Sequence, residues 1–173
     1  MKHTLLSLMI GLGCSQVQVG AGIGSAVIDV NTAGIENPSF TLVFATIGYE
    51  LPLEADDLVL RPYLTIGSGS GAHEQTVNLT QVSSEINSFS TIGLDFVKGL
   101  NENFNLIGGI GYTTIDAEVK LSGFVNTEAS DTDSELGFKL GVGYDFTDNV
   151  GLETYVQFYD SATFASIEAK YTF

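Results

Sequence analysis

The chain has 173 residues, of which 6 are basic and 21 acidic, and its formal net charge is -15. This acidic excess argues strongly against a nucleic-acid-binding surface, which needs clustered lysine and arginine. The single cysteine excludes an internal disulfide and a thiolate zinc cluster. The 20 glycines argue against an all-helical protein, because glycine weakens the interior of a helix.

Residues 1–15 have the pattern of a secretory signal peptide. A short basic start is followed by an apolar run at residues 5–12, and then by the small residues Gly13 and Ser15 that fit the positions before a cleavage site. We place cleavage after Ser15, so that residues 16–173 form a single mature domain. The apolar run is too short for a transmembrane helix, which needs about 20 apolar residues.

A rival interpretation of the same segment makes Cys14 the lipidated first residue of a lipoprotein. Such signals usually carry leucine three residues before the cysteine, and here that residue is Gly11. The signal-peptide interpretation is therefore the one we carry forward.

After residue 16 the hydrophobic pattern has a period of two, which predicts β-strands. In the clearest segment, Leu136, Phe138 and Leu140 alternate with Gly137 and Lys139. The pattern predicts strands at 17–24, 40–51, 58–66, 90–96, 104–112, 136–146, 150–158 and 167–173.

The connections between these segments alternate in length. Those at 52–57, 99–103 and 147–149 are short, those at 31–39, 68–85 and 116–134 are longer and polar, and Ser161 with Ala162 forms a tight fourth turn on the long-loop side. Short turns on one rim and longer loops on the other are typical of a transmembrane barrel.

The two faces of the strands differ in polarity. One face carries leucine, isoleucine, valine, phenylalanine and tyrosine, whereas the opposite face carries glycine, polar and charged residues. An eight-stranded barrel is only wide enough for side chains to fill it, so the bulky apolar face must point outward into lipid. Backbone groups in hydrocarbon must all be paired, which requires a closed sheet. The sequence therefore predicts an all-β fold, an eight-stranded antiparallel up-and-down transmembrane β-barrel with short periplasmic turns and longer extracellular loops.

Aromatic residues support this orientation. They are concentrated at strand ends beside the short turns, where an interfacial girdle is expected. The residues are Tyr49, Phe96, Phe104, Tyr144, Phe146, Tyr171 and Phe173.

Two segments resemble a known family. Residues 136–159, LGFKLGVGYDFTDNVGLETYVQFY, resemble the penultimate hairpin of the OmpA-type small outer-membrane β-barrels of the porin-like superfamily, and residues 167–173, IEAKYTF, resemble the β-signal of outer-membrane proteins. The resemblance implies location in the outer membrane of a Gram-negative bacterium. It also implies contact with outer-membrane lipid and lipopolysaccharide, with the assembly machinery and with periplasmic chaperones. In that family the machinery reads the chain end, a role that the resemblance gives to Ile167, Ala169, Tyr171 and Phe173.

Charged residues on the polar face are the most informative candidates for a site. They are Arg61, Asp95, Lys139, Asp145, Glu153, Glu168 and Lys170. Arg61 and Glu153 lie at about the same depth from the short turns, and their strands, the third and the seventh, are opposite each other in an eight-stranded ring. We hypothesise that Arg61 spans the lumen to Glu153, with Lys170 beside Glu168 and Asp145, because charges removed from water must be paired. Such a network would plug the barrel; the alternative is a set of loosely hydrated charges.

Other candidates carry weaker signals. Asp131, Asp133 and Glu135 form an acidic cluster in the third long loop and could take a hard cation such as calcium, although the calcium-loop pattern is missing and a solvated acidic loop is the default. His73 is the only histidine left after signal removal, and it falls in a Gly/Ser-rich loop. A lipid-modifying enzyme would need it at the membrane rim beside a serine or an aspartate.

We therefore predict a non-enzymatic, monomeric integral outer-membrane β-barrel with a structural or surface-interaction role, which displays acidic extracellular loops and uses no cofactor and no nucleic acid. The first alternative is a narrow pore or small-solute conduit, since an open porin needs about 16 strands. The second alternative is an outer-membrane lipid-modifying enzyme.

Overall fold

The computed structural model describes residues 16–29, 37–53, 58–77, 80–122 and 127–173. This part of the chain forms one antiparallel sheet of nine strands. Their bounds are β1 Gln16–Ile28, β2 Ser39–Pro52, β3 Leu58–Ser70, β4 His73–Val77, β5 Thr80–Gly99, β6 Phe104–Ser122, β7 Thr127–Asp145, β8 Val150–Phe158 and β9 Ala162–Thr172. The predicted signal peptide, with Cys14, lies outside the described residues. Over the same described ranges, no helix is both long and apolar enough to cross a bilayer.

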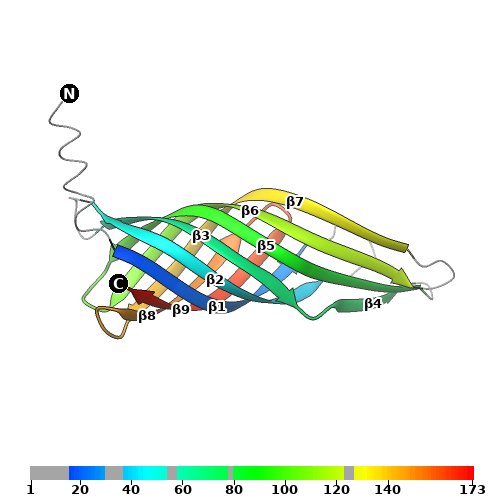
Figure 1. Cartoon of the computed structure of the whole chain (residues 1–173), viewed down its shortest axis with the longest axis horizontal. Coiled ribbons are helices and arrows are strands. Elements are labelled where there is room, and N and C mark those ends of the chain that lie inside the picture. The colour runs from blue at the N-terminus through cyan, green and yellow to red at the C-terminus, as the bar shows by residue number, and fades with distance from the viewer. Residues whose placement is uncertain (1–15, 30–36, 54–57, 78–79, 123–126) are drawn as a thin grey trace, which may run out of the picture.

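The sheet closes on itself into a barrel (Figure 1). β1 pairs with both β2 and β9, and β3 pairs with both β2 and β5, so eight of the nine strands seen in the described residues make a continuous ring. β4 pairs with β5 and stands outside this ring. The predicted eight-stranded antiparallel barrel is therefore confirmed, with one additional strand.

The outer face of the ring is apolar. Phe138 and Leu140 are 63% and 61% exposed, and Lys139 between them is 4% exposed. At the end of the barrel that carries the short turns, aromatic rings pack edge to face, with centroids 4.9 Å apart for Phe104 and Tyr144. Bulky side chains thus point outward along the strands and aromatic rings gather at one rim, as the two-residue period predicts.

The second and third predicted long loops are largely strand. β3 reaches Ser70, β4 and the start of β5 lie within residues 68–85, and β6 and β7 together occupy most of residues 116–134. The prediction of polar loops there was wrong, because a strand that has left the membrane no longer needs an apolar face. Hydroxyl pairs such as Thr114 with Ser134, 2.9 Å apart, link these strands instead. The first predicted long loop, residues 31–39, lies mostly outside the described residues.

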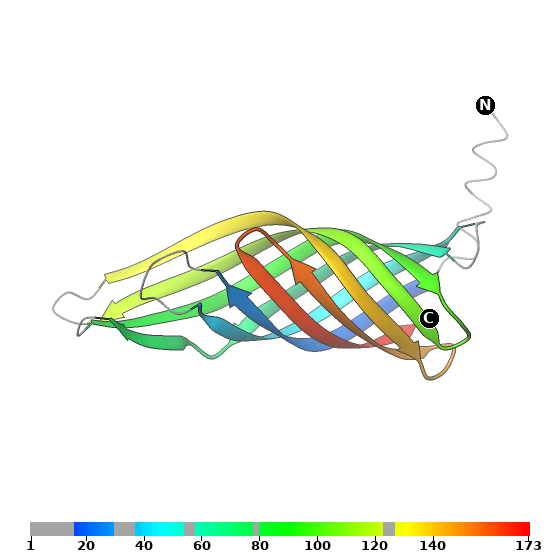
Figure 2. The same cartoon turned by 180° about the vertical axis from the view of Figure 1, so that it is seen from behind.

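These strands extend well past the barrel. β7 pairs with β8 only up to Phe138, and β5 pairs with β3 only down to Phe89. Beyond those points, β4 and residues 80–88, 114–122 and 127–137 form what we call the projecting sheet. Figure 2 shows it running on beyond the turn that joins β8 to β9.

The extracellular half of the lumen contains an apolar cluster, which we call the aromatic plug. Its buried members are Ala26, Phe40, Leu42, Phe44, Ile86, Phe89, Tyr155, Ala162 and Phe164. Ring centroids of Phe89 and Phe164 lie 6.1 Å apart, and those of Phe44 and Phe89 lie 6.5 Å apart. The inward face was predicted to carry glycine, polar and charged residues, and in this half of the lumen large apolar side chains lie there as well. Residues 40–51 are apolar on both faces, so one face meets lipid while the other fills the lumen.

Candidate functional site: the filled lumen

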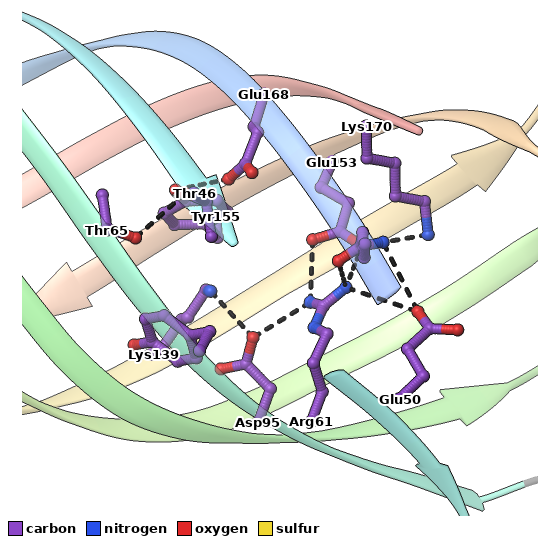
Figure 3. Close-up of polar contacts among 12 residues, drawn as sticks. Thr46, Glu50, Arg61, Thr65, Asp95, Lys139, Glu153, Tyr155, Glu168 and Lys170 are labelled. Atoms are coloured by element: carbon purple, nitrogen blue, oxygen red, sulfur yellow. Dashed lines mark hydrogen bonds and ion pairs between the residues drawn. The ribbon is translucent and has the colours of Figure 1, made fainter. Parts of the chain in front are cut away.

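The periplasmic half of the lumen is filled by charged side chains that come from six strands, and Figure 3 shows most of them pointing toward one another. We call this set the charge layer. Its members are Glu50, Arg61, Asp95, Lys139, Asp145, Glu153, Glu168 and Lys170. Each falls on the inward face of its strand because successive side chains of a strand alternate between the two faces.

Arg61 is the centre of this layer and is 2% exposed. From β3, its guanidinium spans the lumen to the β8 carboxylate of Glu153, with Nη1 2.7 Å from Oε1 and Nη2 2.9 Å from Oε2. The same group donates to Asp95 Oδ2 at 2.9 Å and to Gln18 Oε1 at 2.6 Å. The two parallel bonds to one carboxylate are the arrangement that the planar guanidinium forms best.

Lys139 is held by one carboxylate and two aromatic rings. Its Nζ atom donates to Asp95 Oδ2 at 2.9 Å. The same atom lies 4.3 Å from the ring centroid of Tyr63 and 4.1 Å from that of Tyr155. Two aromatic faces offset part of the cost of removing the ammonium from water.

Lys170 lies closer to the short turns. Its Nζ atom is 3.1 Å from Asp145 and 3.0 Å from Glu153. Glu168, which the sequence also placed beside Lys170, instead accepts a hydrogen bond from the hydroxyl of Tyr155 at 2.9 Å. The structure thus brings Lys170 to Asp145 but directs Glu168 toward the aromatic plug.

Glu50 completes the layer and was missed at the sequence level. Its Oε1 atom lies 3.9 Å from Arg61 Nη1 and accepts a hydrogen bond from Gln18 at 3.4 Å. The two-residue period of β2 puts Glu50 on the same face as Gly48 and Thr46, which is the signal that could have found it. The apolar character of both faces of residues 40–51 hid that signal.

The seven predicted charges all lie on the lumen face. Asp145 is partly exposed, and the other six, Arg61, Asp95, Lys139, Glu153, Glu168 and Lys170, are buried. With Glu50, the layer holds five carboxylates against three cations. The pair of Arg61 with Glu153 links strands on opposite sides of the ring, and the other ion pairs of the layer link adjacent or next-but-one strands. Charge therefore extends across the whole width of the lumen.

Glycines in the barrel wall leave room for lumen side chains that lie close to the backbone. A Cβ atom at Gly93 would clash with the Tyr63 ring, and one at Gly20 would clash with the Glu168 carboxylate. Between the charge layer and the plug, hydroxyl groups of neighbouring strands form hydrogen bonds, and the side-chain oxygens of Thr91 on β5 and Thr113 on β6 are 2.7 Å apart. The lumen is therefore filled by side chains at successive depths.

A polar vestibule opens at the end with the short turns. Its volume is about 550 Å³, and Glu50, Glu102, Asn105, Asp145 and Lys170 are among the residues that line it. The charge layer forms its inner end.

Residues 14–172 match the sequence profile of the outer membrane protein beta-barrel domain. The chain belongs to this family. The predicted resemblance to small outer-membrane barrels and the predicted location in the outer membrane are thereby confirmed. No curated protein matches the chain.

Solved structures of similar shape are outer-membrane barrels. The attachment invasion locus protein Ail of Yersinia pestis superposes with a TM-score of 0.59 at 16% identity, over 92% of this chain and 97% of that one. Neisserial surface protein A gives 0.54 at 18% identity, over 92% and 97%. The N-terminal barrel of Pseudomonas aeruginosa OprF gives 0.54 at 11% identity, over 89% and 97%. At these identities the likeness shows the fold alone.

The C-terminal residues of this outer-membrane barrel lie on its outer face. Ile167 and Tyr171 on β9 are each 43% exposed, and Phe173, just past β9, is 68% exposed. With Ala169, they alternate with the inward-facing Glu168 and Lys170. These outward side chains are therefore part of the apolar outer wall of the barrel.

The remaining sequence candidates lie in the projecting sheet and at its base, and none of them lies in a loop. Asp131, Asp133 and Glu135 are on β7, and His73 is the first residue of β4, with its ring 6.4 Å from that of Phe40. In the described ranges no group of three or more histidine, cysteine or acidic side chains is arranged to hold a metal ion.

Proposed function

We propose that this outer-membrane barrel is a non-enzymatic, monomeric protein whose role is structural or surface-interacting, and that the projecting sheet performs that role. The observation that carries the proposal is the filling of the lumen by the barrel's own side chains. The bidentate contact of Arg61 with Glu153 and the rings of Phe89 and Phe164 occupy the space that a solute would need. A narrow conduit is the alternative that this filling disfavours.

The projecting sheet supplies the surface for such a role. It holds four strands clear of the lipid-facing wall, and it carries Asp131 and Asp133 with exposed side chains. An acidic surface attracts cationic partners and speeds their encounter. In this proposal lipid and lipopolysaccharide surround the wall, and the assembly machinery and periplasmic chaperones act on the chain before insertion.

The non-enzymatic part of the proposal rests on the surroundings of His73. Its ring packs against Phe40 on the extracellular side of the barrel. A hydrolytic histidine needs a nucleophile and an orienting acid in hydrogen-bond reach, and a ring that packs against phenylalanine does not supply that arrangement.

The test combines conductance with surface labelling. In planar bilayers of purified protein, a closed lumen gives no unitary conductance; steady channels would overturn the proposal in favour of a conduit. On intact cells, a membrane-impermeant maleimide should label a cysteine introduced by Ser130→Cys in the projecting sheet. It should not label one introduced by Asp148→Cys in the short turn between β7 and β8, and the unsubstituted chain serves as the blank. Labelling at Asp148→Cys alone would reverse the orientation and also overturn the proposal.

A further inference from the structure

A small cavity lies at the extracellular rim, in the notch where β7 continues past the end of β8. We call it the rim pocket. Its volume is about 150 Å³, and it is lined mainly by apolar atoms, including those of Ile28, Ile115 and Ala162, with Asp131, Asp133 and Glu135 along one wall. Ile28 and Ile115 pack against the aromatic plug, so the floor of the pocket is apolar and continuous with the plug.

The β-sheet register sets the geometry of the acidic wall. Asp131, Asp133 and Glu135 occupy alternate positions of β7 and therefore share one face. Successive members of the three are about 7 Å apart along the strand. Their cross-strand neighbours on β6 are Ala117, Ile115 and Thr113, which carry no charge. The β8–β9 turn closes the notch, where the backbone N–H of Ser161 donates to Glu135 at 3.2 Å.

The three carboxylates of the wall have no cationic partner in the described part of the chain. Among the described residues none of them forms an ion pair. The chain has six lysines and arginines in all. Three are committed to the charge layer, Lys120 pairs with Glu118, Lys98 is near the short turns, and Lys2 is in the predicted signal peptide. Like charges on one face repel each other, and a cation between them would relieve that repulsion.

We propose that the rim pocket binds a lysine or arginine side chain presented by an extended, partly apolar segment of a partner protein. The proposal rests on the surface-interaction role and names the chemistry of its partner. A long cationic side chain combines an aliphatic stem with a charged tip, which matches an apolar floor beside an acidic wall. A cavity of roughly 150 Å³ in other proteins holds a benzene-sized group, which is close in size to a lysine stem.

The test uses barrels in zwitterionic phosphatidylcholine nanodiscs, with empty nanodiscs as the blank. Fluorescence anisotropy reports binding of a dye-labelled, terminally capped pentapeptide, Gly-Leu-Lys-Leu-Gly. Two further probes replace lysine by glutamine, or both leucines by serine. The parent peptide should bind about tenfold or more tightly than either, a difference of about 1.4 kcal/mol, and its affinity should fall as salt rises.

Three variants locate the site. Asp131→Asn with Asp133→Asn should weaken binding about tenfold, whereas Glu102→Gln with Asp148→Asn, which removes equal charge at the opposite end, should leave it within about twofold. Ala117→Leu should also weaken binding about tenfold, because it fills the pocket without changing its charge.

The proposal is overturned if the parent peptide does not bind, if the serine-containing probe binds as well, or if both charge-removing pairs weaken binding equally. Each of those results would indicate diffuse attraction to an acidic surface. The comparison of leucine and serine probes decides the matter even if Ala117→Leu fails to fold. Loss of peptide binding together with intact surface labelling and no conductance would remove the rim pocket and leave the proposed function standing.

Discussion

Replacing Arg61 by alanine tests the charge layer directly. The guanidinium donates four hydrogen bonds, two to Glu153, one to Asp95 and one to Gln18. Without it, Glu153 keeps Lys170 at 3.0 Å and Asp95 keeps Lys139 at 2.9 Å. The balance then falls from three cations to two against the same five carboxylates.

Removing one partner of a buried ion pair costs about 3–5 kcal/mol, because a charge is left in a poorly solvated site. The two remaining lysines offset part of that loss for Arg61→Ala, so we expect a fall in the free energy of unfolding of about 3 kcal/mol, at the lower end of that range. The chain has no tryptophan, so urea unfolding in phospholipid vesicles is best followed by far-UV circular dichroism. The matched control is Lys120→Ala, which removes a half-exposed cation paired with Glu118 and should change stability by less than about 1 kcal/mol.

A second comparison separates lost pairing from lost packing. Arg61→Met with Glu153→Gln removes both charges of the pair, and it should recover part of the stability that Arg61→Ala loses, since a neutral replacement of a buried pair is often tolerated. If Arg61→Ala unfolds at the same urea concentration as the parent and Lys120→Ala, the lumen charges are loosely hydrated and the reasoning is refuted.

Three further predictions concern the plug, a close approach and the chain end. Phe164→Ala removes a ring that is 2% exposed, so it should lower the unfolding free energy by about 3–5 kcal/mol and raise bilayer conductance. Gly93→Ala should destabilise the barrel because its Cβ would clash with the Tyr63 ring, whereas Gly108→Ala, with nothing within 4 Å, should be tolerated; urea midpoints compare the two. Phe173→Ala should reduce the amount of folded barrel in cells, measured by gel mobility without heating, and leave the unfolding free energy of refolded protein near that of the parent.

Each of these has a clear contrary result. A parental conductance for Phe164→Ala, once it has been shown to be folded, would mean that the charge layer closes the lumen alone. Equal urea midpoints for Gly93→Ala and Gly108→Ala would show that the Tyr63 ring moves to accommodate the added methyl group. Normal cellular assembly of Phe173→Ala would remove the role that the family resemblance gives to that residue.

The barrel wall could be predicted from the sequence because its two faces differ in solvent. Along β8, Glu153 and Tyr155 face the lumen while Leu152 and Val156 face lipid, and a period of two records that difference. The pairing of Arg61 with Glu153 followed from counting along strands that are opposite in the ring, and their bidentate contact lies where that count put it.

The period of two could not reveal features in which the two faces do not differ. In the projecting sheet, residues 127–135 of β7 are almost wholly polar on both faces, so this stretch around Asp131 resembled a loop. Residues 114–122 of β6 do alternate, with Ile115, Ala117 and Val119 on one face, and that period could have predicted this strand. In β2 both faces meet apolar surroundings, so the sequence pattern does not show that Leu42 and Phe44 point into the lumen. For the same reason it does not show that Glu50 points there. The partners of Glu168 and Lys170 depended on the tilt and stagger of the ring, which one strand's pattern does not contain.

The charge layer also has a consequence for how the ring finds its alignment. A strand that slips by two residues keeps every apolar side chain on the lipid side, so the alternation cannot distinguish it from the native register. The same slip moves a carboxylate such as that of Glu153 by about 7 Å along the strand, out of reach of the Arg61 guanidinium. The lumen charges on six strands therefore select the native register when the barrel closes, since that stagger of the strands brings each charge to its partner.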